Sequence, residues 1–356
     1  MATVLESTAA RVRRLGPDEL AARAEEWNAV VAEARRPNPF QLAECVLAWF
    51  DTARDRPELV ALAAERDGRL AAVVALALAP YGPLRRLEPI AGAESPPFDV
   101  QAASEHADLA RALVDELRAL EFDYAQLPAL DAAGTLAAPD AGLQPIERLA
   151  GPVVELEPGT GASRRLLSRN ERKALERRTR RLEEIGELRI ETGDSPELLE
   201  ELLAVHERRW SGGGDASSFS TVRGREFHRR VVEALNGSGI VRSTTVRLDG
   251  RLLAFQYAFL VGGSLLCLRI AHDPGFARYS PGTVALMAAI DDGALHGAHR
   301  VELLGHQEDY KLRLATSFEP MSWGIGWAQT ARGRIACSVD RAALRARIAF
   351  RDRRGR

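Results

Sequence analysis

The sequence predicts a mixed α/β protein built from two similar halves, and three observations carry that prediction. The stretch 241–312 reads as three strands, a helix and one more strand. The stretch 59–127 shows the same order of elements. The chain has 356 residues, a length that gives each of two domains enough residues for its own core.

The first three strands of the second half form a predicted meander. Residues 240–247 are rich in β-branched side chains, and Asp249-Gly250 signals a two-residue hairpin because both positions can adopt φ > 0. The returning strand covers 251–261. After Gly262-Gly263 the strand 264–270 is densely apolar, which suits a strand covered on both faces.

A helix and a fourth strand follow this meander. The helix is expected from about Thr283 to Gly297, and its face toward the sheet contains Leu286, Met287, Ile290 and Ala294. The strand 300–304 comes next. Because a helix separates it from the previous strand, the two strands should be parallel with a right-handed crossover. A strand that leads to a helix N-terminus presents free N–H groups to a phosphate-bearing cofactor.

The first half repeats the pattern from a hairpin at Asp67-Gly68. The tetrapeptide Asp-Gly-Arg-Leu that begins there recurs at 249–252. An amphipathic helix over 107–120 and a strand over 122–127 follow in the same order as in the second half. Four matching residues alone would be a chance match, but the shared order of elements favours duplication of one domain. The N-terminal domain is expected to cover 1–155, the C-terminal domain 156–335, and a basic tail 336–356.

Composition excludes several classes of protein. A formal net charge of −2 argues against wholesale binding to nucleic acid or an anionic membrane, since both favour strongly basic proteins. The isolated cysteines Cys45, Cys267 and Cys337 indicate neither a disulfide framework nor a metal site. The N-terminus has no apolar signal core, and the longest apolar run, 70–80, is too short to span a bilayer. We expect a cytoplasmic protein without a bound metal.

Four features of the second half occur together: the Asp-Gly hairpin, the loop Tyr279-Ser280-Pro281-Gly282, the helix after it, and Gly305 followed by Tyr310-Lys311. Together they resemble the CelD branch of the GNAT-superfamily acyltransferases, named after a bacterial cellulose-biosynthesis protein. The tandem GNAT fold of that branch is similar to the fold of the FemABX peptidyltransferases. The resemblance covers about 38–327 and includes Asn38-Pro39-Phe40 and the segments 180–183 and 206–210.

The resemblance implies an α/β fold of two tandem GNAT-like domains. Each would be a mixed, mostly antiparallel sheet with flanking helices and a splayed pair of parallel strands. The resemblance also implies acyl-CoA as the donor, with acetyl-CoA as the leading candidate. The donor-binding residues would be Arg278, Tyr279, Ser280, Gly282 and Thr283.

The donor loop departs from the GNAT pattern, which is Gln/Arg-x-x-Gly-x-Gly/Ala. Aligned on Arg278, this chain has Pro281 and Thr283 where the glycines would fall, with Gly282 between them. Proline removes one N–H donor from a phosphate cradle, although it is well tolerated at a helix start. In the first half, 94–107 contains Pro96-Pro97 and no glycine. We therefore expect a degenerate N-terminal domain and a C-terminal domain that binds the donor.

Transfer of an acyl group from a thioester to an amine needs a neutral amine, a polarised carbonyl and a proton for the departing thiolate. The resemblance implies Tyr310 as the general acid and Lys311 as a ligand for a substrate anion. A core aromatic residue and a solvated lysine are the alternatives for these two positions. His306 is favoured as the general base because an ordinary imidazole has a pKa of about 6.5. The choice stays open among His272, Glu302, His306, Glu308 and Asp309.

A basic helix is expected over 164–184, because nine basic residues face two acidic ones between Arg164 and Arg181. Ser168 and Glu171 have the spacing of a capping box and support a helix start. Three roles stay open: a solvated connecting helix, a phosphate-binding wall for the donor or a sugar nucleotide, and a landing site for tRNA. The run contains no aromatic residue, which weakens the RNA interpretation.

The leading acceptor is an amine on a sugar, a polysaccharide precursor or a small metabolite, an expectation that rests on family analogy. Two other functions stay open: aminoacyl-tRNA-dependent transfer like that of FemABX proteins, and a non-catalytic ligand-binding or scaffold role for the same fold. Trp210, beside the loop 211–214, is interpreted as an aromatic anchor near the acceptor. The substrate-binding candidates are Lys311, Trp210, Arg178, Arg181 and His272.

Overall fold

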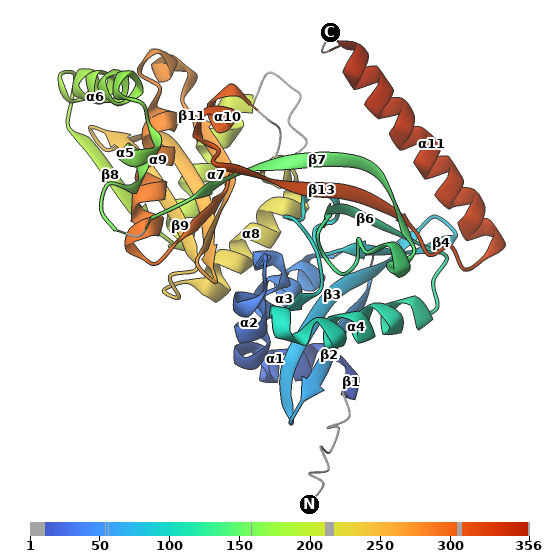
Figure 1. Ribbon diagram of the computed structural model, residues 1–356. Coiled ribbons are helices and arrows are strands. Elements are labelled where there is room, and N and C mark those ends of the chain that lie inside the picture. Colours follow the sequence, from blue (N-terminus) through green and yellow to red (C-terminus); the bar gives the residue numbers. More distant parts are fainter. Residues whose placement is uncertain are drawn as a thin grey trace, which may run out of the picture. The chain divides into compact units, whose positions relative to one another are not determined.

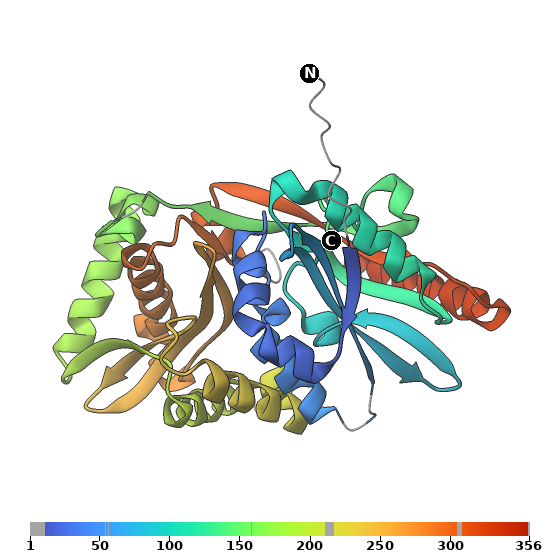
Figure 2. The same cartoon turned by 90° about the horizontal axis from the view of Figure 1, so that it is seen from below.

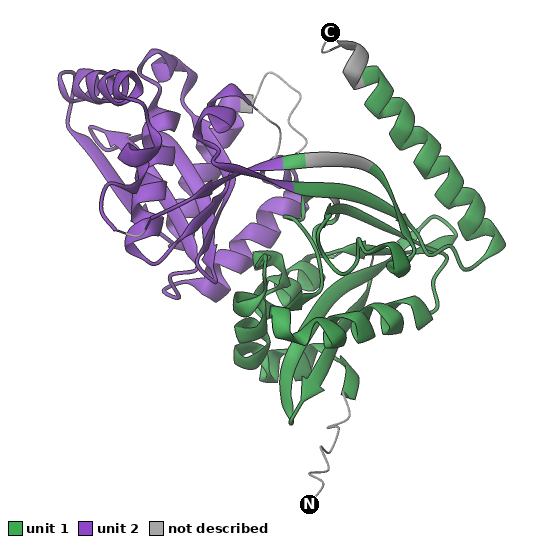
Figure 3. Ribbon diagram, in the orientation of Figure 1, with its two compact units in different colours: residues 1–150, 320–356 green, residues 151–319 purple. Residues whose placement is uncertain are grey.

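The structure is a computed structural model that describes residues 11–53, 55, 57–157, 159–210, 217–304 and 308–354 (Figure 1). Internal contacts divide it into two compact units (Figure 3). Unit 1 contains residues 1–150 and 320–356, and unit 2 contains residues 151–319.

Unit 1 is a mixed sheet with helices on both faces (Figure 2). Its strands lie in the order β1 (Arg11–Leu15), β2 (Glu58–Arg66), β3 (Arg69–Tyr81), β4 (Leu84–Pro89), β6 (Tyr124–Asp131) and most of β13 (Ser317–Gly326). Strands β4 and β6 are parallel, and the other neighbours are antiparallel. The short β5 (Gln101–Ala102) pairs with β3. The helices are α1 (Pro17–Ala22), α2 (Ala24–Glu33), α3 (Ala43–Thr52), α4 (Ala107–Ala119) and α11 (Ala331–Arg354), with 3₁₀ turns η1 (Pro39–Gln41), η2 (Gly92–Glu94), η3 (Ser104–His106) and η4 (Pro139–Ala141).

The core of unit 1 follows from the period of its helices and strands. The apolar side of α4 packs on β2, β3 and β6 to form one buried cluster, which includes Leu109, Leu113, Leu117, Leu62 and Leu76. On the other side of β3, the buried Gln41 amide donates to the Ala75 carbonyl at 3.0 Å and accepts from its N–H at 2.7 Å. A buried amide that satisfies both backbone groups fixes η1 against the sheet.

Unit 2 repeats this arrangement. Its strands lie in the order β7 (Leu143–Glu155, from residue 151 on), β12 (Arg300–Glu302), β11 (Ser264–His272), β10 (Arg251–Val261), β9 (Val241–Leu248) and β8 (Leu188–Gly193). Strands β11 and β12 are parallel, which confirms the predicted crossover pair. The helices are α5 (Ala162–Leu166), α6 (Arg169–Glu183), α7 (Pro196–Trp210), α8 (Val222–Leu235), α9 (Pro281–Leu295) and α10 (Asp309–Leu314), with 3₁₀ turns η5 (Ser218–Ser220) and η6 (Pro274–Tyr279).

The two predicted Asp-Gly hairpins share their backbone conformation. Asp67 and Gly68 have φ of 53° and 77°, and Asp249 and Gly250 have φ of 48° and 79°. In each hairpin the pairing register slips in the returning strand, leaving Ala71 and Leu253 as the extra residues of equivalent β-bulges. A shared turn followed by a shared bulge supports the duplication predicted from the order of the elements.

The strands β7 and β13 change the expected domain boundaries. Strand β7 follows β6 in the chain, yet its residues Val153–Glu155 pair with β12 of unit 2. Strand β13 follows β12, yet it pairs with β6 of unit 1. Each sheet is therefore completed by a strand from the other half of the sequence. The units divide at 150/151 and 319/320, whereas the sequence placed the boundaries at 155/156 and 335/336. Most of the stretch expected as a tail is the helix α11 of unit 1.

The start of α11 provides a test of this boundary. A Cβ placed on Gly333 would lie 2.1 Å from the backbone oxygen of Asp123, a separation that the packed backbone cannot accept. Gly333→Ala should therefore lower the free energy of unfolding by about 1–3 kcal/mol, despite the higher helix propensity of alanine. Gly282→Ala in α9 is the matched control, because its Cβ would meet His272 at an ordinary 3.6 Å. Urea unfolding that finds both variants equally stable would contradict the docking of α11 on unit 1.

Candidate functional site

The parallel strands β11 and β12 separate after a short pairing. They pair from Ser264 to Leu266 on one strand and from Arg300 to Glu302 on the other. Strand β11 then continues to His272, held on its other edge by β10. On the β12 side, the described residues give this part of β11 no strand partner. A strand edge without a strand partner can hold a ligand through its backbone, although the Leu268 carbonyl already accepts from the Arg269 guanidinium at 2.8 Å.

A β-bulge lies where the two strands separate. Tyr257 pairs with Arg269 and Ala258 pairs with Cys267, so Leu268 is an extra residue in β11. A bulge increases the local twist and re-aims the strand. This one comes directly after the last residues that pair with β12, and it marks the beginning of the open edge.

The end of β11 meets the start of α9. The N-cap residue Ser280 has φ of 52° and ψ of 48°, and Pro281 is the first helical residue. A Cβ added to the buried Gly282 would lie 3.6 Å from His272 Nδ1 and 3.7 Å from Ile270 Cδ1. The helix therefore begins within van der Waals distance of the strand end. Its N-terminus carries partial positive charge, which favours an anion there.

His272 is a half-buried imidazole at this junction. Burial lowers its pKa, the positive charge of Arg209 at the end of α7 lowers it further, and Asp273 opposes both. The imidazole is therefore held in its neutral form near pH 7, the form that can accept a proton. The structure thus brings together two residues that the sequence gave separate roles, His272 and Gly282.

The other predicted donor-binding residues have different surroundings. Tyr279 is buried against Leu182 of α6 and Leu253 of β10, so its ring belongs to the core of unit 2. Arg278 is exposed, and its guanidinium lies 4.7 Å from the Tyr279 ring centroid and donates to the Tyr279 hydroxyl at 2.9 Å. Thr283 is exposed in the first turn of α9.

The predicted basic helix is α6. The capping box is present, with Glu171 N–H donating to Ser168 Oγ at 3.3 Å and Ser168 N–H donating to the Glu171 carboxylate at 2.9 Å. The helix contacts both η6 and α9. Its buried Leu182 provides the packing, whereas Arg178 is half-buried and Arg181 is exposed. The basic helix therefore lies against the segments that form the α9 N-terminus.

Tyr310 and Lys311 lie in α10, on the other side of the open edge. Tyr310 is half-buried against a core cluster that contains Cys267. Burial raises the pKa of Tyr310, and the negative charge of Glu308 raises it further, so the hydroxyl keeps its proton. Its neighbour Cys267 is buried, and desolvation raises the pKa of that thiol to about 12.

Lys311 is buried, which rules out the solvated-lysine alternative. Its ammonium donates to the Leu304 carbonyl at 2.7 Å and lies 2.6 Å from the Glu308 carboxylate. Leu304 has φ of 45°, a left-handed conformation that is costly for a leucine. Lys311 thus fixes the strained backbone that follows β12.

The remaining candidates contribute less to the described geometry. Glu308 and Asp309 are exposed. Glu302 is buried and lies 3.0 Å from the Arg300 guanidinium, an ion pair that does not suit a free base. His306 lies outside the described residues, as does the side chain of Trp210. The sequence analysis missed Cys267 and Arg209, whose positions beside Tyr310 and His272 depend on tertiary packing.

In unit 1 the parallel strands β4 and β6 correspond to β11 and β12. The open edge that would lie beside them is occupied by another segment of unit 1. Phe98 N–H donates to the Ala129 carbonyl at 2.8 Å, and Asp131 N–H donates to the Phe98 carbonyl at 2.9 Å. The short β5 then pairs with β3. The segment 98–102 therefore occupies the path that β4 leaves between β3 and β6.

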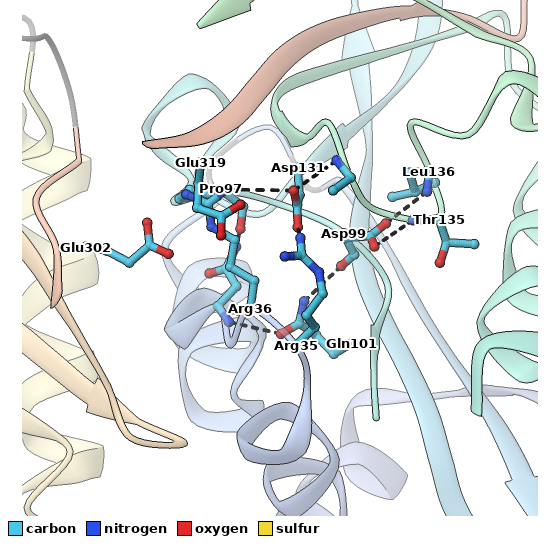
Figure 4. Close-up of polar contacts among 12 residues, drawn as sticks. Arg35, Arg36, Pro97, Asp99, Gln101, Asp131, Thr135, Leu136, Glu302 and Glu319 are labelled. Atoms are coloured by element: carbon cyan, nitrogen blue, oxygen red, sulfur yellow. Dashed lines mark hydrogen bonds and ion pairs between the residues drawn. The ribbon is translucent and has the colours of Figure 1, made fainter. Parts of the chain in front are cut away.

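Polar side chains hold this filling segment in place (Figure 4). The Asp99 carboxylate accepts from the N–H groups of Thr135 at 2.8 Å and Leu136 at 2.9 Å. Burial raises the pKa of Asp99 to about 6, although those two hydrogen bonds oppose the rise. The buried Asn38 donates to the Pro97 carbonyl at 3.2 Å. The Asn38-Pro39-Phe40 motif thus supports the segment that closes unit 1.

Two kinds of site, a membrane-spanning helix and a metal site, are absent from the part of the chain that the structure describes. There, no helix is long and apolar enough to cross a membrane. The same residues contain no group of three or more His, Cys, Asp or Glu side chains that could hold a metal ion.

Comparisons with known proteins agree with this geometry. A family model described as "Acetyltransferase (GNAT) domain" matches residues 169–312, from the start of α6 into α10. No curated protein sequence matches the chain. Among solved structures, FemX is similar with a TM-score of 0.62 and 12% identity, over 88% of this chain and 96% of that one.

Two further solved structures have the same kind of fold. L-PGS from Bacillus licheniformis has a TM-score of 0.53 and 11% identity, over 92% of this chain and 96% of that one. A tandem GNAT protein from the clavulanic acid biosynthesis pathway has a TM-score of 0.51 and 15% identity, over 91% of this chain and 100% of that one. The chain therefore has the tandem GNAT-like fold predicted from its sequence, and its second half matches a GNAT acetyltransferase domain.

Proposed function

We propose that this protein is an N-acyltransferase of the CelD branch, which moves an acyl group from acyl-CoA to an amine on a sugar, a polysaccharide precursor or a small metabolite. Acetyl-CoA is the leading donor. One observation carries the proposal: the open edge of β11 leads to the N-terminus of α9, beside the basic helix α6. The closed counterpart in unit 1 supports a donor site in unit 2.

The residues around the open edge suit the reaction. The start of α9 and the arginines of α6 would bind the phosphates of the donor, and the backbone of β11 would hold its extended arm. The amine nitrogen forms a bond to the thioester carbon while the carbon–sulfur bond breaks. His272 would take the proton that the amine loses, directly or through water. Tyr310 would donate a hydrogen bond to the departing thiolate, which then takes its proton from solvent.

Donor binding is the first test of the proposal. Because CoA would bind only the folded protein, it should stabilise the protein by about 2–3 kcal/mol at a hundredfold excess over its Kd. Melting curves with CoA and with acetyl-CoA measure this effect. A melting temperature that neither CoA nor acetyl-CoA changes would exclude the acyl-CoA assignment. If the same protein bound aminoacyl-tRNA at physiological salt, FemABX-like transfer would replace acyl-CoA transfer.

Charge reversal on α6 tests the phosphate-binding wall. Arg178→Glu combined with Arg181→Glu should weaken CoA binding roughly tenfold or more, because each hydrogen bond to a charged group contributes about 1.5–3 kcal/mol. The loss should shrink at high salt. The melting temperature should change little, since Arg181 is exposed, Arg178 is only half-buried, and charges near the surface contribute little to stability. Isothermal titration calorimetry measures the affinity.

The matched control uses the same helix. Arg169→Glu combined with Lys173→Glu reverses two exposed charges in the N-terminal part of α6, on average about 13 Å along the helix axis from Arg178 and Arg181. This control should bind CoA nearly as wild type does. If both pairs of substitutions weaken CoA binding equally, α6 acts only through its overall charge. The hypothesis that Arg178 and Arg181 form a phosphate-binding wall would then be wrong.

A further inference from the structure

The helix α11 has two different sides. Its inner side packs on unit 1 through Cys337 and Leu344, in a cluster with Tyr124 and Ile325. Asp340 accepts a hydrogen bond from the Tyr124 hydroxyl at 2.7 Å. These contacts fix the rotation of the helix, which Figure 1 labels α11, about its own axis, so they also fix which of its residues face away from unit 1.

The outer side of α11 is apolar. Ile335 is 68% exposed, Val339 is 60% exposed and Phe350 is 57% exposed. At 3.6 residues per turn these three side chains share one side of the helix, opposite Cys337 and Leu344. We call this side the outer stripe; its members, all exposed, are Ile335, Val339, Ala342, Ala346, Ala349 and Phe350.

The outer stripe lies in a strongly basic helix. The sequence of α11 contains eight arginines and two aspartates. Arg334, Arg345 and Arg347 are exposed, and on a helical wheel they lie on either side of the stripe. One of the two aspartates is Asp340, which faces the inner side. Apolar residues flanked by arginines are typical of helices that lie in the interface of an anionic bilayer.

We propose that α11 docks this protein on the surface of a membrane that contains anionic phospholipids. The outer stripe would enter the boundary between headgroups and acyl chains, and the flanking arginines would contact lipid phosphates. The overall charge of −2 argues against binding through the whole surface, but it leaves room for one basic helix to bind, because salt screens charges beyond about 8 Å at physiological ionic strength. The local charge of α11 decides the attraction.

The outer stripe could instead bind a second copy of the chain. The positive charges of α11 disfavour such a dimer. Pairing two copies of the outer stripe would bring the exposed Arg334, Arg345 and Arg347 of both copies to one interface, and like charges across an interface oppose association. The stripe is also narrow and half alanine. Stable interfaces between proteins usually bury about 1,600 Å², more than one side of a single helix provides.

Vesicle co-sedimentation of the full-length protein tests the proposal. Vesicles of equimolar phosphatidylglycerol and phosphatidylcholine should bind the protein, and vesicles of phosphatidylcholine alone should bind it far more weakly. Each arginine near an anionic surface strengthens binding about fivefold. Arg345→Gln combined with Arg347→Gln should therefore weaken binding about 25-fold. Ile335→Gln combined with Val339→Gln should weaken it at least about tenfold, by removing apolar area from the stripe.

Val222→Gln is the matched control, because Val222 is 75% exposed at the start of α8, a different helix that belongs to unit 2. It should bind vesicles as wild type does, and all the variants should keep the wild-type melting temperature. Equal binding to the two kinds of vesicle, or wild-type binding by the stripe variant, would overturn the proposal. So would a dimer in light scattering that the stripe variant disrupts while vesicles stay unbound, because the stripe would then belong to a second copy.

Discussion

Tyr310→Phe should lower turnover about 10²-fold or more, within the 10²–10⁴ range of general acid catalysis, while CoA binding stays near wild type. The ring is half-buried beside Cys267, and Phe preserves that packing while it removes only the hydroxyl. The raised pKa of Tyr310 keeps the proton on its oxygen. An unperturbed thiol has a pKa of about 8.5, so the hydroxyl acts mainly as a hydrogen-bond donor to the thiolate. One such donor typically contributes about 10²–10³.

The measurement is steady-state turnover with a verified donor and acceptor, together with a melting curve. Tyr81→Phe is the matched control, because Tyr81 is 44% exposed, belongs to unit 1, and loses the same hydroxyl. A core aromatic role for Tyr310 predicts full activity in Tyr310→Phe. That result would exclude the acid role and direct attention to His306, Glu308 and Asp309.

The elements of the second half were predictable because their signals are local. Asp249 and Gly250 adopt the positive φ that a two-residue hairpin needs, and β9 and β10 end and begin beside them. The helix start differs slightly, since α9 begins at Pro281 where Thr283 was expected. Pro281 is a favourable first helical residue because its fixed φ suits the helix and its missing N–H is not needed there.

The domain boundaries were not predictable from the same signals. The sequence analysis predicted neither β7 nor β13, and the period and turn residues of a segment contain no information about which sheet edge a strand joins. The pairings of Val153–Glu155 with β12 and of Met321–Gly326 with β6 are contacts between distant parts of the sequence. The segment 98–102, which closes unit 1, depends on such contacts in the same way.

Part of the site was predictable and part was not. A crossover from β11 through α9 to β12 requires the strand end and the helix start to be neighbours, so the proximity of His272 and Gly282 follows from the fold. The buried position of Lys311 does not, because lysine is among the least often buried residues. Only the tertiary structure shows that the Leu304 carbonyl and Glu308 hold its ammonium.

The stability of unit 2 should fall below pH 6.5 through one buried imidazole, that of His228 in α8. His228 is fully buried, and its ring lies 4.9 Å from the ring of Phe219. Its Nε2 lies 2.9 Å from Ser218 Oγ and its Nδ1 lies 3.3 Å from the Tyr257 hydroxyl. Burial lowers the pKa of His228 to about 3, and the nearby charge of Arg269 contributes to the shift.

The direction of the pH effect follows from proton uptake. Between pH 3 and 6.5 His228 is protonated in the unfolded chain but stays neutral in the folded state. The stabilisation is therefore complete above pH 6.5 and is lost as the pH falls toward 3. A full proton changes the free energy of unfolding by about 1.4 kcal/mol per pH unit. The loss from this residue should reach roughly 3 kcal/mol at pH 4.5.

Urea titrations from pH 8 to pH 4.5 measure this slope, and His228→Gln should flatten it because glutamine does not titrate. Other groups also titrate in this range, so the difference between variant and wild type isolates His228. Phe227→Leu is the matched control: it removes a neighbouring buried ring, so it costs stability, but it keeps the imidazole and should keep the wild-type slope. If His228→Gln and Phe227→Leu show the same pH dependence, the acid sensitivity arises from other groups, and His228 does not limit the stability of unit 2.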